Sequence, residues 1–351
     1  MKKQIAFSLV LVMMLGLLAG CAGTAVVYYG ECTCPTGGNT PAPTDPVNPP
    51  AEGAVKTGLS VITNVSKSAN ATCAEYDVTL VAVTVDDKGV IEQCIIDSIG
   101  TKVEFDGSGA LTKVPETIAT KNELGDSYGM VAGGGAKYEW YQQAAALADY
   151  AEGKTLAQLK SGAISESGYA AEGTDLAASA TIYLGSYVSA IEVAVNNAKH
   201  LGAVAGDELR LAAIPSAASS VGATVSKAGT AQLDVDVTAL TVKDGIITSC
   251  YIDSVQAKVT FDANGEISSD ISAPIQTKNE LGELYGMQAW GGAKYEWNVQ
   301  AANFAAYVTG KTAAEVAGIA VSEGKPSDAD LSAGVTIAIG GFQALIAKAM
   351  K

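Results

Sequence analysis

The sequence predicts an α+β protein made of two tandem homologous domains, each an antiparallel sheet with helices gathered after it. The first observation is a duplicated block: residues 120–140 recur at 277–297 with seventeen of twenty-one positions identical and no gap. The second is the order within each copy, where β-branched runs joined by Gly turns precede helical apolar stripes. The period of about 156 residues matches a whole domain and exceeds that of solenoid repeats. Any function is therefore expected twice.

The N-terminal sequence predicts the cellular compartment of the protein. Two lysines precede an apolar run over residues 5–18, and Leu-Ala-Gly-Cys follows at 18–21. The run is too short to span a membrane and ends at small residues, which is typical of a secretory signal peptide over residues 1–20. The last four residues resemble a bacterial lipobox, which implies that lipid on Cys21 anchors the protein to the extracytoplasmic side of the cell membrane. The alternative is an ordinary signal peptide with an incidental cysteine.

Residues 21–54 are predicted to be a lipidated tether. Six prolines fall between residues 35 and 53, together with Gly, Thr and Asn. Such a composition favours an extended chain over a packed core. The tether would hold the repeats away from the membrane.

Composition and charge exclude several function classes. The formal net charge of −15 becomes −17 once the two lysines of the signal peptide are removed, and an acidic chain repels phosphate backbones, so nucleic acid is not an expected partner. Cys94 and Cys250 occupy equal places in apolar runs and are expected to be small buried hydrophobic residues. The cysteine spacing matches neither a zinc site nor a disulfide framework. The single histidine, His200, is expected to be a solvated linker residue.

Repeat one is predicted over residues 55–200 and repeat two over residues 213–351, with a short Ala- and Gly-bearing joint between them. Gly turns between β-branched runs predict a hairpin in each repeat. Because each repeat has its own strands and helices, each is expected to fold alone. The expected strands are 78–85, 90–96 and 102–105 in repeat one, and 235–242, 246–252 and 258–261 in repeat two.

Each duplicated block leads into an amphipathic helix. Apolar residues recur at i, i+4, i+7, i+8 and i+11 from Trp140 and from Trp297. The following Gly-Lys-Thr resembles the end of a phosphate loop, but the segment before it is helical and lacks the upstream Gly. We therefore expect Gly153 and Gly310 to end these helices and the Thr to cap the next one. A last helix closes each repeat, with Tyr187, Ile191 and Val195 matched by Phe342, Ile346 and Met350.

A polar run of small residues precedes each closing helix. It reads Asp-Leu-Ala-Ala-Ser-Ala-Thr from Asp175 to Thr181, and Asp-Leu-Ser-Ala-Gly-Val-Thr from Asp330 to Thr336. Both resemble the flavin-attachment motif of the FMN-binding domain family: Asp, two residues, Ser-Gly-Ala-Thr. The Asp and the Thr stand at the family spacing in both copies. The other positions vary. At the family's Gly, repeat two has Gly334 and repeat one has Ser179. At the family's Ala, repeat one has Ala180 and repeat two has Val335, and at the family's Ser both repeats have Ala, at 178 and 333.

The resemblance implies a cofactor and its attachment. In that family a flavin transferase joins FMN through its phosphate to the Thr hydroxyl, which implies covalent FMN on Thr181 and Thr336. The N-terminus of a helix offers unpaired N–H groups and a positive dipole end to a phosphate, and a helix is expected a few residues after each Thr. The alternative is that each Thr is a β-branched residue within a strand.

Two functions of different classes remain open, and a reductase that uses the flavin on a small substrate is a third option. The resemblance implies a membrane-anchored extracytoplasmic flavoprotein, an electron relay at the cell surface rather than a catalyst, with an unknown redox partner. The alternative is a cofactor-free surface lipoprotein that binds a ligand or another envelope protein. The strength of the duplicated block supports it, because Tyr128, Trp140, Tyr285 and Trp297 could stack on a ligand. The simpler account of the block is a helix packed on a Gly-rich turn.

Overall fold

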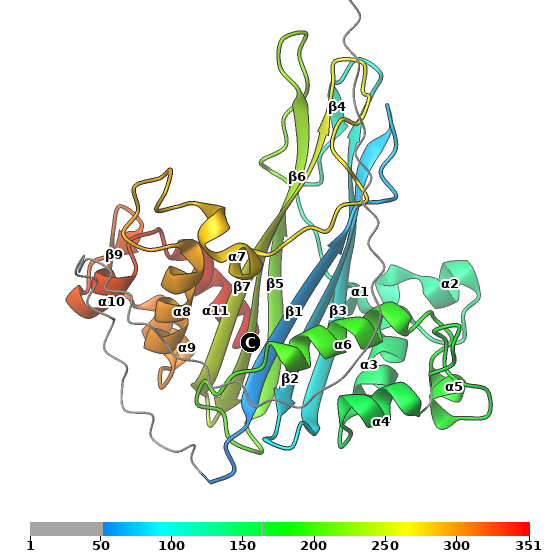
Figure 1. Cartoon of the computed structure of the whole chain (residues 1–351), viewed down its shortest axis with the longest axis vertical. Coiled ribbons are helices and arrows are strands. Elements are labelled where there is room, and N and C mark those ends of the chain that lie inside the picture. Colours follow the sequence, from blue (N-terminus) through cyan, green and yellow to red (C-terminus); the bar gives the residue numbers. More distant parts are fainter. Residues whose placement is uncertain (1–51, 163) are drawn as a thin grey trace, which may run out of the picture. The chain divides into compact units, whose positions relative to one another are not determined.

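The computed structural model describes residues 52–162 and 164–351. The expected signal peptide, Cys21 and nearly all of the tether lie outside these residues. These described residues lie in one compact unit. Within the described part, the chain is a mixed α and β protein with antiparallel sheets and eleven α-helices (Figure 1). None of these helices is long and apolar enough to cross a membrane.

Each repeat contributes one main antiparallel sheet. The strands of the first sheet pair in the order β1 (Lys56–Asn64), β2 (Cys73–Val85), β3 (Ile91–Phe105) and β4 (Leu111–Lys113). The strands of the second pair in the order β5 (Glu208–Ser216), β6 (Gly229–Lys243) and β7 (Ile246–Phe261). The expected hairpins are therefore present in both repeats, as β2–β3 and β6–β7.

Two expectations about the strands were wrong. Residues 102–105 and 258–261 do not form separate strands, because the β-ladder continues unbroken through the pairs Asp77↔Gly100 and Leu233↔Ala257. The first strand of each repeat was not expected at all. As a result, β5 already begins at Glu208, inside the segment taken as the joint.

Both faces of the long strands are buried, since successive side chains point to opposite sides of a sheet. In β2, Tyr76, Val78 and Leu80 belong to a cluster between the two sheets. Val81 and Val83 belong to a second cluster beneath the helices of repeat one. A third cluster fills the same place in repeat two. The apolar residues therefore form one shared inner core and two outer ones, instead of two separate domain cores.

The inner core relates the two repeats by an approximate two-fold axis. Phe105 and Phe261 occupy equivalent positions and stack on each other, with ring centroids 4.0 Å apart and planes 2° apart. Nearby, Ala71 donates its N–H to the Gly265 carbonyl at 2.7 Å, and Ala223 donates to the equivalent Gly109 carbonyl, also at 2.7 Å. In each of these two bonds one repeat donates and the other accepts, with the roles exchanged between them, as in a self-complementary two-fold interface.

The sheets also meet along two equivalent edges. At the first seam, between β1 and β7, the hydroxyls of Thr57 and Ser249 lie 2.6 Å apart. At the second seam, between β3 and β5, the Gln93 side chain accepts from the Leu209 N–H at 3.0 Å and donates to the Asp207 carbonyl at 2.7 Å. Figure 1 shows β1 and β7 side by side. Polar groups thus fix the register of the two sheets at both edges.

Helices cover the outer face of each sheet. In repeat one these are α3 (Trp140–Ala151) and α6 (Gly185–Asn196), and in repeat two α8 (Trp297–Val308) and α11 (Gly340–Ala349). Short helices connect them: α1 (Lys121–Leu124), α2 (Met130–Gly134), α4 (Leu156–Ser161), α5 (Asp175–Ser179), α7 (Lys278–Leu281), α9 (Ala313–Ala317) and α10 (Ala329–Gly334). Two 3-10 turns, η1 (Gly125–Tyr128) and η2 (Gly282–Tyr285), and the small hairpin β8 (Val321–Ser322) with β9 (Lys325–Pro326) complete the elements.

The structural interpretation of Gly-Lys-Thr is confirmed. Gly153 and Gly310 follow α3 and α8 in the left-handed region, with φ of 73° and 84°. Thr155 and Thr312 then cap α4 and α9, each in a capping box closed by the side chain three residues on. The Gly residues permit a backbone turn that a β-carbon would strain.

Candidate functional site

The duplicated block fastens the start of each helical region to its sheet. Thr120 caps α1 in a capping box with Glu123, and Thr277 caps α7 with Glu280. In repeat two the buried Asp253 carboxylate of β7 accepts the N–H groups of Ser254 at 2.7 Å and Asn279 at 3.1 Å. Asp97 makes the same bonds in repeat one. The sheet therefore holds the first turn of each short helix.

A lysine in each block lies between two aromatic rings. The Lys121 ammonium is 5.0 Å from the Tyr128 ring centre and 4.9 Å from that of Trp140. Lys278 lies 5.3 Å from Tyr285 and 4.8 Å from Trp297, and burial lowers its pKa. The two tryptophan side chains are only 3% and 6% exposed. They are consequently not open stacking surfaces for a ligand, and that part of the alternative expectation was wrong.

A buried glutamate completes each block. The Glu139 carboxylate accepts the N–H groups of Met130 at 2.8 Å and Val131 at 2.9 Å, at the start of α2. Glu296 accepts those of Met287 and Gln288 at the same distances. Charge-assisted bonds of this kind are roughly twice as strong as neutral ones. The near-identity of the two blocks thus has a structural explanation in a helix held on a Gly-rich turn.

The motif threonines occupy equivalent settings in the two repeats. Thr181 donates its N–H to Gln143 Oε1 at 2.8 Å, and its hydroxyl lies 3.2 Å from the same oxygen. Thr336 makes both contacts with Gln300, at 2.8 and 3.2 Å. The two glutamines are fully buried. A core side chain therefore fixes the position of each hydroxyl.

Neither threonine lies in a strand, so the strand alternative is wrong. Thr181 is exposed and Thr336 is half-buried, each in a loop between two helices. The closing helices begin four residues later, at Gly185 and Gly340, and neither has a side-chain N-cap. The expected proximity of each threonine to a helix start is confirmed.

The other motif residues lie on the short helix before each threonine. Asp175 and Asp330 are exposed in the first turns of α5 and α10. Asn303 of α8 donates to the Gly334 carbonyl at 3.0 Å, and a β-carbon on Gly334 would lie 2.7 Å from its Nδ2. Repeat one has Ser179 at the Gly position, and its counterpart of Asn303 is Ala146. The repeat with the larger residue at the motif position thus has the smaller residue at the matching helix position.

Cationic and aromatic side chains lie beside each motif. Lys294 donates to the Ala333 carbonyl at 3.0 Å and lies 4.9 Å from the Tyr295 ring centre, while Lys311 lies 4.3 Å from that of Tyr307. A cavity of about 410 Å³ opens here, lined by both tyrosines, Asn303, Asp330, Leu331, Ala333 and Gly334. In repeat one, Lys137 donates to the Ala178 carbonyl at 3.4 Å and lies by Tyr138, and Lys154 lies over Tyr150.

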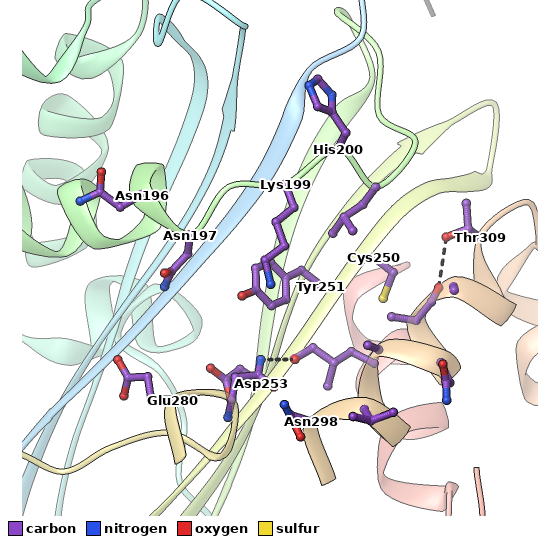
Figure 2. Close-up of a pocket in the computed structure, with 18 residues that line it drawn as sticks. Asn196, Asn197, Lys199, His200, Cys250, Tyr251, Asp253, Glu280, Asn298 and Thr309 are labelled. Carbon is purple, nitrogen blue, oxygen red and sulfur yellow. Dashed lines mark hydrogen bonds between the residues drawn. The ribbon is translucent and has the colours of Figure 1, made fainter. Parts of the chain in front are cut away.

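A larger cavity of about 790 Å³ lies beside the first seam (Figure 2). Its walls come from the C-terminal end of α6, the linker (residues 198–207), β7, α7 and α8. The polar side chains that matter most are Lys199, Tyr251, Asp253, Glu280 and Asn298. Sequence reasoning missed this set. The one available signal was that Asn298 replaces Tyr141 between otherwise similar helix starts.

Comparison with protein-family models, with curated proteins and with solved structures found no match. Within residues 52–162 and 164–351, no three His, Cys, Asp or Glu side chains are grouped so as to hold a metal ion. Cys94 and Cys250 are buried free thiols, as expected, and burial raises the pKa of both, that of Cys250 to about 12. His200 is exposed in the linker and lies 3.0 Å from Asp87.

Proposed function

We propose that this chain is a membrane-anchored extracytoplasmic flavoprotein that carries FMN on Thr181 and Thr336 and relays electrons at the cell surface. The observation that carries the proposal is the setting of the two hydroxyls. Each stands in a helix-connecting loop, is held by a buried glutamine and follows a run that resembles a flavin-attachment motif. The flavin would supply the redox chemistry, and the chain would supply attachment and orientation.

The residues around each threonine fit a flavin phosphate. Lys294 in repeat two and Lys137 in repeat one lie against the short helix that precedes each threonine, where an ammonium could pair with a phosphate. Tyr295 and Tyr307 line the cavity at Gly334, two residues before Thr336 in the chain. The helix starts at Gly185 and Gly340 add N–H groups that lack side-chain caps. We assign binding and positioning roles to these residues and no catalytic role.

Attachment would be catalysed by a separate flavin transferase. The threonine oxygen forms a bond to the flavin-side phosphorus of a flavin dinucleotide such as FAD, the hydroxyl gives up its proton, and the pyrophosphate bond breaks with departure of AMP. The bond formed is a phosphoester, and no electron is transferred in this step. The redox partners of the attached flavin lie outside what the chain itself specifies.

Intact-mass spectrometry after co-expression with a flavin transferase tests this proposal. We expect two flavin adducts in the wild type, one in Thr181→Ala or Thr336→Ala, and none in the double variant, because only a hydroxyl can form the phosphoester. Thr→Ser variants at the same positions should retain some modification, since the nucleophile remains. An unmodified wild-type mass would reject covalent attachment. A colourless protein in addition would favour the alternative of a cofactor-free surface lipoprotein that binds a ligand or another envelope protein.

The anchoring part of the proposal rests on Cys21, which lies outside the described residues. Its thiol is the group that would take the lipid, so Cys21→Ala should release the mature chain into the medium or block its processing. Membrane fractionation followed by immunoblotting measures this, with Cys32→Ala as the matched control. If Cys21→Ala fractionates like the wild type, the lipoprotein assignment fails.

A further inference from the structure

Repeat one places two of its own carboxylates beside the outer edge of β3. Glu152, at the C-terminal end of α3, accepts the Cys94 N–H through its Oε1 at 3.2 Å. Asp149 lies one turn earlier on the same helix. Burial raises the pKa of the Cys94 thiol, and the nearby charges of Glu152 and Asp149 raise it further. A carboxylate therefore has a defined place at this strand edge.

Repeat two keeps the strand edge and loses the carboxylate. Cys250 is the counterpart of Cys94 and holds the same place in the β-ladder, so its N–H also points away from the neighbouring strand. Thr309 stands in place of Glu152, and its hydroxyl donates instead to the Ala305 carbonyl at 3.1 Å. Among residues 52–162 and 164–351, no side chain takes the place of Glu152 at the Cys250 N–H.

The cavity beside the first seam lies at this place. Its volume of about 790 Å³ is within the usual range for ligand sites, and its lining includes Cys250 and Thr309. Ala306, which also lines it, stands where repeat one has Asp149. Both positions at which repeat two has lost a carboxylate therefore belong to the wall of the cavity.

We propose that this cavity binds a small carboxylic acid with an apolar body, whose carboxylate takes the place that Glu152 holds in repeat one. The carboxylate accepts the Cys250 N–H, and the Lys199 ammonium adds a positive charge to the same wall. Figure 2 shows Cys250 and Lys199 beside one space. Val299 and Ala302 of α8 are exposed in the lining and have no polar side-chain atom, so they contact the apolar body. The site involves neither motif threonine and is independent of the flavin proposal.

The acidic side chains of the lining lie toward α7, away from this strand edge. Asp253 follows Cys250 by three residues along β7, which is roughly 10 Å at the rise of a β-strand. Its carboxylate accepts the N–H groups of Ser254 and Asn279, and Glu280 belongs to the capping box of α7. A cationic ligand could use only that end and would leave the Cys250 N–H without an acceptor. The cavity therefore favours a carboxylate over an amine.

Isothermal titration of the purified protein with octanoate tests the inference. We expect octanoate to bind, and octan-1-ol to bind at least about tenfold more weakly, since an alcohol offers no charged acceptor. Thr309→Glu should abolish octanoate binding, because it gives repeat two the carboxylate that repeat one already has at this place. Thr309→Ser keeps the hydroxyl and adds no carboxylate, so it should bind octanoate like the wild type.

A steric variant keeps the test decisive if Thr309→Glu unfolds. Ala302→Trp should abolish octanoate binding by filling the cavity, whereas Ala145→Trp, at the equivalent exposed position of α3, should not. The inference is overturned if octanoate gives no binding heat, if octan-1-ol binds as tightly as octanoate, or if a folded Thr309→Glu or Ala302→Trp variant binds octanoate like the wild type. Binding of octylamine in preference to octanoate would overturn it in favour of a site for cations.

Discussion

At the scale of single residues, the buried Asp253 links a charge to folding. Its carboxylate lies in β7, is 8% exposed and accepts two backbone N–H groups. Burial raises its pKa to about 6 from an ordinary 3.8. Between these two pH values the folded state therefore holds a proton that the unfolded chain has already lost. The stability that this proton provides is present below about pH 4 and is lost as the pH rises to about 6. Burial also raises the pKa of Asp97, the counterpart of Asp253 in repeat one.

We predict that Asp253→Asn removes this pH dependence. Asn keeps an oxygen that can accept the N–H groups of Ser254 and Asn279, but it carries no charge. Relative to the wild type, the variant should gain stability between pH 4 and pH 7.5, on the order of 2–3 kcal/mol for a shift of about two units. Urea unfolding at both pH values measures the difference. A variant that loses stability relative to the wild type over that range would contradict the prediction.

The exposed Asp262 provides the opposite case. Its pKa is lowered because its carboxylate accepts the N–H groups of Glu266 and Asn264. Its contribution is present above its ordinary pKa and is lost as the pH falls through the lowered value. Asp262→Asn should therefore change the pH dependence of the free energy of unfolding in the direction opposite to Asp253→Asn. It serves as a control for the general effect of an Asp→Asn substitution.

At the scale of elements, each outer helix depends on a few large side chains against the sheet. Phe304 of α8 is fully buried, and its ring centroid lies 5.2 Å from that of Phe342 in α11. Leu147 holds the equivalent position in α3 and is also fully buried. The equivalent positions of the two helices are thus both fully buried, although their side chains differ in size.

Phe304→Ala should lower the free energy of unfolding by about 3–5 kcal/mol, since it removes the ring and leaves a cavity beside Phe342. Phe304→Leu should cost less, because Leu fills part of that volume. Denaturant unfolding gives both values, and Ala302→Gly on the exposed face of α8 reports the cost of a helix substitution alone. A loss below about 1 kcal/mol for Phe304→Ala would show that α8 does not depend on this contact.

At the scale of the whole described unit, the two repeats bury their inner sheet faces against each other. Repeat one supplies Tyr76, Leu80 and Phe105, and repeat two supplies Leu233 and Phe261. An isolated repeat would expose this face to water, at roughly 25 cal/mol for each Å² of apolar surface. Because the contact is nearly two-fold, a single repeat could pair with a second copy of itself.

We therefore predict that fragments 55–205 and 206–351, which divide the chain before β5, do not behave as folded monomers. Each should associate with itself or lose fixed tertiary packing, and mixing the two should restore a one-to-one complex. Light scattering after gel filtration and near-ultraviolet circular dichroism measure these outcomes. Monomeric fragments that unfold cooperatively would support two independent domains, as the sequence alone suggested.

Local pattern was enough for the duplication, both hairpins, the four main helices and the capping boxes at Thr155 and Thr312. The hairpins, helices and capping boxes depend on residues two to four positions apart, so the sequence contains their whole signal, and the duplication is found by comparing the two copies directly. The sequence left both a loop and a strand open for Thr181 and Thr336, because their Ala, Ile and Val neighbours also suit a strand.

The shared core, the two seams and the large cavity were decided by tertiary structure. The bond between Thr57 and Ser249 joins residues 192 positions apart, and no local period records such a pairing. The strands β1 and β5 were missed in part for the same reason, since each packs against the other repeat as well as against its own, β1 on β7 and β5 on β2 and β3. The sequence by itself determined that the chain contains two copies of one unit. Only the packing of one copy on the other decided that they share a core and that their sheets meet at two polar seams, because these contacts join residues far apart in the chain.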